Sequence, residues 1–183
     1  MKQEGRILIV DDDEDILTAG KLLLGRKFTS VATCNRPEHI PSFITGQTFD
    51  AILLDMNFNP GESDGEQGFF WLKKILELKP DSVIIMITAH GGVDVAVEAM
   101  KLGATDFIAK PWQNEKLLAT LSAAVRLKES YNEVDKLQKK QKQLQSDLKK
   151  PYTDIIGSSA SMKNIFSIID RVAQTDANIE HFQ

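Results

Sequence analysis

The sequence predicts an α/β protein: a doubly wound, five-stranded parallel sheet followed by one long helix. Five short apolar runs are continuous rather than alternating, as expected for strands buried on both faces of a parallel sheet. Helix-like stretches separate these runs, and that alternation favours a sheet with helices on both faces. Residues 112–150 contain no Gly or Pro, whereas residues 1–111 contain ten of the 11 Gly and five of the six Pro.

The predicted strands are the apolar runs, which in chain order are Arg6–Val10, Val31–Cys34, Ala51–Leu54, Val83–Thr88 and Asp106–Ala109. The predicted helices are Asp15–Leu24, a weaker one over Pro37–Ile44, Gln67–Leu78, Val93–Leu102 and one that starts near Gln113. Asp13 or Asp15 is a candidate N-cap for the first helix. Gly103 is a plausible end for the Val93–Leu102 helix.

Composition narrows the classes of function. The chain has 22 Lys+Arg against 26 Asp+Glu, a net charge of -4, which argues against a protein that mainly coats nucleic acid. Its one cysteine, Cys34, rules out an intramolecular disulfide and fits a reducing compartment. No run of about 18 apolar residues predicts a membrane span, and the early acidic residues argue against a signal peptide. We therefore expect a cytoplasmic protein without membrane contact.

Polar residues stand where four of the predicted strands end. Asp11 and Asp12 follow the first strand, Asp55 the third, and Lys110 the fifth, while Thr88 closes the fourth. Each has an ordinary explanation alone, as a helix cap, a strand hydroxyl or a surface lysine. The carboxyl ends of parallel strands meet at one edge of a sheet, where the sites of such folds lie. The convergence of all these groups therefore predicts a functional site at this edge of the sheet.

The chemistry of this group suits phosphoryl transfer to a carboxylate. Crowded carboxylates repel one another, and Mg²⁺ relieves that repulsion. A carboxylate can attack phosphorus and form an acyl phosphate. Lys110 and the Thr88 hydroxyl could then stabilise the charge on the phosphoryl oxygens. No Cys/His cluster indicates zinc, and the three histidines lie in different segments without a nucleophile beside them.

Residues 5–127 resemble the receiver domain of a bacterial two-component response regulator. The motifs that carry the resemblance are ILIVDDDED, AILLDMN, MITAH and GATDFIAKPW. The resemblance implies a flavodoxin-like sheet with strand order 2-1-3-4-5. It also implies a phosphorylation switch that receives its phosphoryl group from a sensor histidine kinase.

The same resemblance implies roles for the residues around the acceptor. Asp55 would be the phosphorylated residue. Asp12 would bind Mg²⁺ directly, Asp11 would support the ion through water, and Asn57 would offer its backbone carbonyl.

Further roles fall on the last two strands. Thr88 and Lys110 would contact the phosphoryl oxygens, and Phe107 would rotate inward when Thr88 is drawn to the phosphate. The peptide bond between Lys110 and Pro111 would be cis, an isomer that proline makes accessible.

One departure from the family pattern lies after Asp55, where Phe58–Gly68 reads as an insertion of several residues. The simplest interpretation is a solvated loop. The alternative is a loop that shapes access to Asp55 or contacts the kinase.

The chain is expected to have three parts: a receiver domain at 1–127, a coiled-coil linker helix at 128–150 and the start of an ATPase domain at 151–183. Five of the seven heptad core positions in the linker are apolar, which favours a parallel two-stranded homodimer over a solvated polar helix. The a positions are Leu127, Val134, Gln141 and Leu148, and the d positions are Ser130, Leu137 and Leu144. A buried Gln141 would fix the register.

The segment TDIIGSSASMKNIFSIIDRVAQTDANI resembles the opening of the AAA+ domain of NtrC-type sigma-54-dependent activators. Ser161 is a plausible helix N-cap, with Met162, Ile165, Ile169 and Val172 on one face. No glycine follows Gly157, so no phosphate-binding loop is present in these residues. The resemblance implies that the longer protein binds ATP, DNA and sigma-54 RNA polymerase, and that this part of it binds no nucleic acid.

The leading hypothesis is a response regulator that changes its dimer arrangement on phosphorylation to control sigma-54-dependent transcription, with no enzymatic activity beyond its own phosphorylation and dephosphorylation. One alternative is a Mg²⁺-dependent phosphatase of the haloacid-dehalogenase type, because Asp11 and Asp13 form a D-x-D pair; Asp55 would then be idle. Another alternative is a receiver that dimerises without phosphorylation. The presence of Asp12, Asp55, Thr88 and Lys110 together argues against it.

Overall fold

The computed structural model of the chain describes residues 2–58, 65–89, 93–148, 163–165, 167, 168 and 171. In chain order the elements are β1 (Gln3–Val10), α1 (Glu14–Lys27), β2 (Phe28–Cys34), the 3₁₀ helix η1 (Pro37–His39), α2 (Ile40–Gly46), β3 (Ala51–Asp55), α3 (Glu66–Leu78), β4 (Ile84–Thr88), α4 (Val93–Lys101), β5 (Asp106–Ala109) and α5 (Asn114–Leu148). The chain divides into units of residues 1–137 and 138–183. The boundaries of the receiver, linker and ATPase parts stay predictions.

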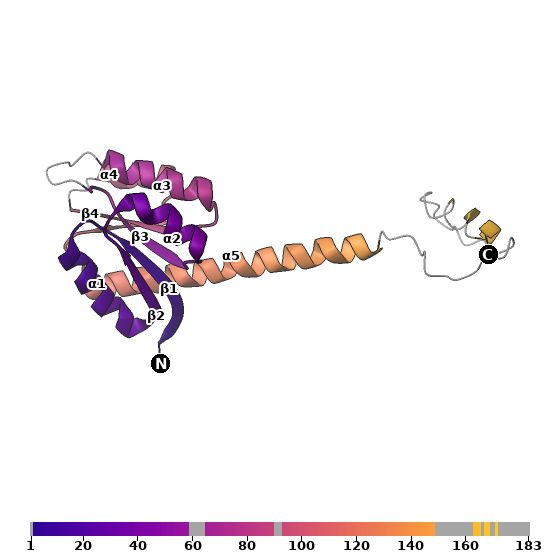
Figure 1. Cartoon of the computed structure of the whole chain (residues 1–183), viewed down its shortest axis with the longest axis horizontal. Coiled ribbons are helices and arrows are strands. Elements are labelled where there is room, and N and C mark those ends of the chain that lie inside the picture. The colour runs from indigo at the N-terminus through magenta and orange to yellow at the C-terminus, as the bar shows by residue number, and fades with distance from the viewer. Residues whose placement is uncertain are drawn as a thin grey trace, which may run out of the picture. The chain divides into compact units, whose positions relative to one another are not determined.

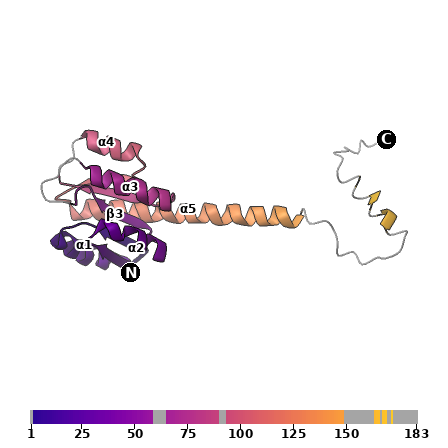
Figure 2. The same cartoon turned by 45° about the horizontal axis from the view of Figure 1, so that its top comes forward.

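The predicted sheet is confirmed: five parallel strands in the order β2-β1-β3-β4-β5. Helices α1 and α5 cover one face, and α2, α3 and α4 cover the other (Figure 1). Figure 2 shows the same arrangement from a second direction, with α3 and α4 lying next to each other. The chain is therefore doubly wound around the sheet.

The core consists of two apolar layers, one on each face of the sheet. Leu8 and Val10 of β1 belong to the layer under α2, α3 and α4. Ile7 and Ile9, which alternate with them, belong to the layer under α1 and α5. All four are buried, because β1 has a neighbouring strand on each side and helices on both faces. This double burial explains why the run is continuously apolar.

The edge strands depart from the prediction of burial on both faces. β2 has several half-buried or exposed residues between Phe28 and Cys34, and only Ile108 of β5 is fully buried. Each edge strand has a partner on one side only, so its side chains are less completely covered.

The termini of α1 and α4 follow the sequence signals. Asp13 is the N-cap of α1, and its Oδ1 accepts hydrogen bonds from the N–H groups of Asp15 at 2.8 Å and Ile16 at 3.4 Å. Gly103 has a φ of 103° and ends α4 in a left-handed turn. Its N–H donates to the Met100 carbonyl, as is usual for such a helix end.

The weak helix predicted over Pro37–Ile44 is divided into η1 and α2. Pro41 has no N–H group, so it cannot donate the α-helical bond that would reach back to the Pro37 carbonyl. The N–H of Ile40 bonds that carbonyl instead, in 3₁₀ geometry.

Helix α5 changes character along its length. Leu117, Leu121 and Val125 are buried against the sheet, and Leu127 still packs on the same layer. Lys128 is buried too, and its ammonium donates to the Asp81 carbonyl at 2.8 Å and pairs with the Asp81 carboxylate. No local sequence pattern indicated this contact, since a lysine in a helix is usually solvated.

The heptad positions beyond Lys128 lie on an exposed helix. Val134, Leu137 and Leu144 have exposed fractions of 52%, 60% and 56%, so about half of each apolar side chain faces solvent. Gln141 and Ser130 are exposed as well, whereas the Leu148 side chain lies outside the described residues.

The described part of residues 138–183 beyond α5 is helical, and Ile165 is exposed there. Ser161, Met162, Ile169 and Val172 lie outside the described residues. Within the described chain, no helix combines the length and the apolar content that a membrane span needs.

We predict that Gly68→Ala destabilises the protein by about 1–3 kcal/mol, because a side chain there overpacks a backbone contact. A Cβ on Gly68 would lie 2.6 Å from the Met56 Cα and 2.8 Å from its carbonyl oxygen. Urea unfolding followed by circular dichroism measures the loss.

The matched control is Gly25→Ala in α1, where no described atom lies within 4 Å of the added Cβ. This exchange should raise stability by up to about 1 kcal/mol, since Ala favours a helix over Gly. A Gly68→Ala protein as stable as the parent would show that α3 does not rest on the backbone after Asp55.

Candidate functional site

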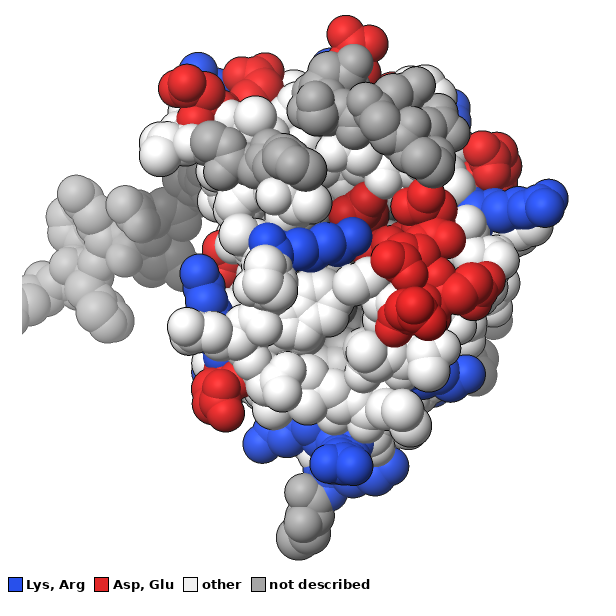
Figure 3. Space-filling view, turned by 90° about the vertical axis from the view of Figure 1, so that its left-hand side faces the viewer, with Lys and Arg blue, Asp and Glu red and all other residues white. Residues whose placement is uncertain are grey.

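The register of the sheet brings the predicted site residues to one edge. Val10 pairs with Leu54, so the residues that follow β1 stand beside Asp55, the last residue of β3. Thr88 ends β4 and pairs with Ala109, which places Lys110 next to it. Figure 3 shows acidic side chains gathered in a patch on the face that looks out from this edge.

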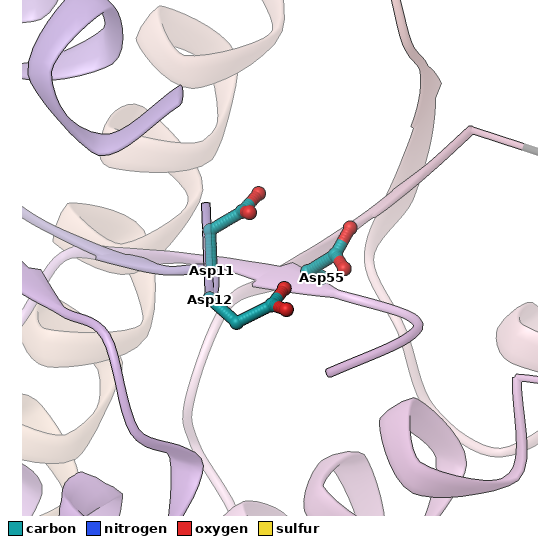
Figure 4. A group of neighbouring side chains, drawn as sticks. All are labelled: Asp11, Asp12 and Asp55. Carbon is teal, nitrogen blue, oxygen red and sulfur yellow. The ribbon is translucent and has the colours of Figure 1, made fainter. Parts of the chain in front are cut away.

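Three carboxylates meet at this edge. Asp11, Asp12 and Asp55 each offer one oxygen, and these oxygens all lie within 4.8 Å of one another. Figure 4 shows the Asp12 carboxylate pointing toward Asp55. Asp11 and Asp55 are buried, whereas Asp12 is exposed. The group therefore has two enclosed carboxylates and one at the solvent side.

Lys110 lies between the two buried carboxylates. Its Nζ is 2.7 Å from Asp11 Oδ2 and 2.8 Å from Asp55 Oδ1, and its side chain is only 16% exposed. Its backbone N–H donates to the Thr88 carbonyl at 2.7 Å, and the peptide bond to Pro111 is cis. The ordinary explanation of Lys110 as a solvated lysine is wrong, because its ammonium is held by ion pairs.

Burial and charge shift the acid–base equilibria of these groups. Burial raises the pKa of Asp11 to about 6; the Lys110 ammonium opposes this shift and the charge of Asp55 adds to it. Burial also raises the pKa of Asp55, again against the effect of Lys110. Burial lowers the pKa of Lys110, but its ion pairs with the two carboxylates outweigh that effect and raise the pKa overall.

Backbone groups hold the two buried carboxylates in place. Asp11 Oδ1 accepts a hydrogen bond from the Asp13 N–H at 3.1 Å, and Asp55 Oδ2 accepts one from the Asn57 N–H at 3.1 Å. Asn57 also uses its side chain: Oδ1 accepts from the Gly65 N–H at 3.0 Å. Gly65, at the start of α3, has a φ of 73° and no side chain with which to cap the helix.

This side-chain role of Asn57 was missed in the sequence, which suggested only its backbone carbonyl. The glycine-rich stretch before α3 was the one sequence feature that could have indicated this contact. A helix that begins after Gly has no capping side chain at that position, so another residue must accept its first N–H groups.

The donor set fits a hard divalent cation. Three carboxylates and one ammonium give the group a formal charge of −2, and Mg²⁺ prefers one or two carboxylates together with water. Among the described residues, Asp11 Oδ2 is a buried oxygen that faces the ammonium without a well-directed hydrogen bond. Asp12, which is exposed, could ligate an ion beside Asp55 while leaving room for its waters.

Thr88 and Phe107 stand on the last two strands of the sheet, and the Thr88 carbonyl accepts the backbone N–H of Lys110. Thr88 is buried at the end of β4. Phe107 of β5 pairs with Met86 and packs, half-buried, against the layer under α2, α3 and α4. Their roles in a switch stay predictions.

Residues 7–122 match the response regulator receiver domain family. The chain belongs to this family. The receiver is also similar in sequence to transcriptional regulators. The regulator AlgB of Pseudomonas syringae pv. tomato is 33% identical over 178 residues, which cover 97% of this chain. NtrC of Escherichia coli K12, a DNA-binding transcriptional regulator, is 27% identical over 177 residues.

The chain spans 37% of the length of that AlgB and 35% of that NtrC. The predicted resemblance to a two-component response regulator related to NtrC is therefore confirmed for the receiver, while the activities of the longer relatives are a matter of proposal.

Solved structures support the same assignment. A receiver domain from Bacteroides fragilis is 40% identical, with a TM-score of 0.60 over 67% of this chain and 98% of that one. NtrX from Brucella abortus, in complex with ADP, is 26% identical with a TM-score of 0.63 and covers 96% of this chain and 36% of its own. The beryllofluoride-activated NtrC4 receiver domain, a dimer, is 34% identical with a TM-score of 0.59 over 67% of this chain and 98% of that one.

We predict that Asp11 of the receiver titrates near pH 6 after treatment with a chelator, rather than near its ordinary 3.8. Because folding raises this pKa, the protonated Asp11 carboxyl contributes to the stability of the fold. The contribution is complete below the pKa of the unfolded chain, near 3.8, and is lost as pH rises through about 6. Carboxyl-carbon NMR measures the midpoint, with Asp11→Asn to assign the signal.

Added Mg²⁺ should lower that midpoint, because a nearby cation favours the charged carboxylate. A midpoint that stayed near 3.8 without Mg²⁺ would contradict the burial described for this group.

Proposed function

We propose that this receiver is a phosphorylation switch in which Asp55 accepts a phosphoryl group from a sensor histidine kinase in the cytoplasm. The observation that supports this proposal best is the buried Asp55 carboxylate, held 2.8 Å from the Lys110 ammonium and beside Asp11 and Asp12. The proposed nucleophile, its counter-cation and the proposed metal ligands thus lie together at one edge of the sheet.

The proposed reaction is a displacement at phosphorus. One Asp55 oxygen forms a bond to phosphorus while the bond from phosphorus to the donor breaks, and the departing donor keeps the electron pair. Asp12 and Asp55, with Asp11 in support, would hold Mg²⁺, and the bound ion would supply positive charge that stabilises the phosphoryl oxygens. Lys110 leaves its carboxylate pair for a second oxygen, and the Thr88 hydroxyl donates to a third.

The geometry favours this switch over a phosphatase with a D-x-D nucleophile. In that alternative Asp13 would act on the substrate, but its Oδ1 caps α1 through the N–H groups of Asp15 and Ile16. Asp55 would have no part, although it is the buried carboxylate paired with Lys110. We therefore propose that the chain turns over only its own acyl phosphate.

We further propose that phosphorylation changes a homodimer formed through the exposed part of α5, and so controls sigma-54-dependent transcription through domains of a longer protein. The support is a helix with exposed Val134, Leu137 and Leu144 at heptad spacing, which a second copy would cover. In the longer protein, ATP, DNA and sigma-54 RNA polymerase would be bound by other domains. The similarity to AlgB and NtrC, both named as transcriptional regulators, is consistent with this output.

We predict that Asp55→Asn abolishes phosphoryl labelling by acetyl phosphate and Mg²⁺, because an amide is a poor nucleophile. Intact-mass spectrometry should find one added phosphoryl group on the parent and none on the variant. The control is Glu77→Gln, an exposed carboxylate at the far end of α3, which should label like the parent. Full labelling of Asp55→Asn would assign the nucleophile to another residue.

We predict that the double variant Leu137→Asp, Leu144→Asp is monomeric, because a coiled coil would bury two pairs of like charges. The control places the same charges on the outer face of the heptads, as Asn132→Asp with Ser146→Asp, and should stay dimeric. Sedimentation velocity compares the three proteins, and acetyl phosphate labelling checks each receiver. A double variant as dimeric as the parent would rule out the α5 interface.

A further inference from the structure

A cleft of about 720 Å³ lies beside the acidic site of Asp11, Asp12 and Asp55. It runs between the first turns of α3 and the segment that follows β2. Among its described lining residues, Asp12 alone belongs to that site and has a part in the proposed phosphoryl transfer. Its size is that of a site for a ligand of several connected groups, such as a short peptide segment.

Aromatic side chains form one wall and the floor of this cleft. Phe58 is buried at the floor, and Trp71 is half-buried on α3. Phe70 is 58% exposed, and its ring meets that of Trp71 edge to face with centroids 5.1 Å apart. A large exposed aromatic ring at the mouth of a cleft is typical of an interaction site.

Charged residues on the rim indicate what the cleft would accept. Among the described lining residues, Asp12, Glu38 and Glu66 contribute carboxylates, and Arg36 contributes the one cation. The acidic excess disfavours phosphates, nucleic acid and anionic lipid. A cation that also stacks on aromatic rings would suit both the carboxylates and the aromatic wall of the cleft. Among side chains, the arginine guanidinium best combines the positive charge with a planar face.

We propose that this cleft, bounded by Arg36–Glu38 on one side and Glu66–Trp71 on the other, is a docking site for an arginine-bearing segment of a partner polypeptide. The guanidinium would lie against Phe70 and Trp71 with its charge facing Glu38 and Glu66. The volume leaves space for a neighbouring aliphatic side chain over Phe58. The site stands apart from Asp55, so this inference does not depend on the proposed phosphorylation.

The test uses the blocked peptide Gly-Arg-Leu-Arg-Gly as the probe, followed by amide NMR of the full chain. Saturable shifts are expected at residues 35–38 and 66–71. The matched probe replaces each arginine by citrulline, which keeps the planar shape and loses the charge. It should bind at least about threefold more weakly, as expected when a cation–π contact is lost.

Two variants locate the contact, each with a control of the same chemical kind. Phe70→Ala and Glu38→Gln should each weaken binding by about threefold or more. Leu22→Ala removes an exposed apolar side chain from α1, and Glu77→Gln removes a carboxylate from the far end of α3; neither should change the affinity. An amide NMR spectrum of free Phe70→Ala that matches the parent away from α3 confirms an intact receiver, and this check does not depend on the proposed phosphorylation.

Equal binding of the arginine and citrulline peptides would overturn the proposal. So would an affinity that Phe70→Ala leaves unchanged, shifts confined to other faces, or no shifts at millimolar peptide.

Discussion

One ammonium between two buried carboxylates is the interaction on which the site depends. Asp11 and Asp55 are both almost inaccessible to solvent, and each contacts Lys110 Nζ at under 3 Å. Burying carboxylates without a counter-charge costs several kcal/mol per ion, so this arrangement needs Lys110 charged and in place. The pKa shifts follow from the same balance, because burial raises both carboxyl pKa values while the shared cation limits the rise.

The surrounding fold keeps that arrangement in position. The parallel register places the ends of β1 and β3 side by side, and the Thr88 carbonyl fixes the backbone of Lys110. Asn57 links Asp55 to the start of α3 with one backbone and one side-chain hydrogen bond, and Gly68 lets that helix rest on the chain just after Asp55. In the proposed switch, a phosphoryl group on Asp55 would compete for Lys110 and for these bonds, and would thereby act on β4, β5 and α3.

Much of this could be predicted from the sequence, for physical reasons. The central strands are buried on both faces, so Arg6–Val10 and Ala51–Leu54 are continuously apolar, and the polar residues that follow them had to meet at one edge of the sheet. Contacts between residues distant in the chain could not be predicted. The Lys128–Asp81 pair joins α5 to the turn before β4, and no local pattern distinguishes Lys128 from a solvated lysine. Pro41 did carry a local signal, since its missing N–H divides the second helical segment.

The decisive experiment on the role of Lys110 is the labelling of Lys110→Met by acetyl phosphate at saturating Mg²⁺. We propose that Lys110 both balances the charge of the buried carboxylates and stabilises the phosphoryl oxygens, and that a bound cation can replace it only in the first of these roles. We therefore expect Lys110→Met to bind Mg²⁺ at least as tightly as the parent and to be labelled about a hundredfold more slowly, the usual cost of losing one such stabilising donor. Labelling at the parent rate would show that Lys110 is only a counter-ion for Asp11 and Asp55, and would contradict the account.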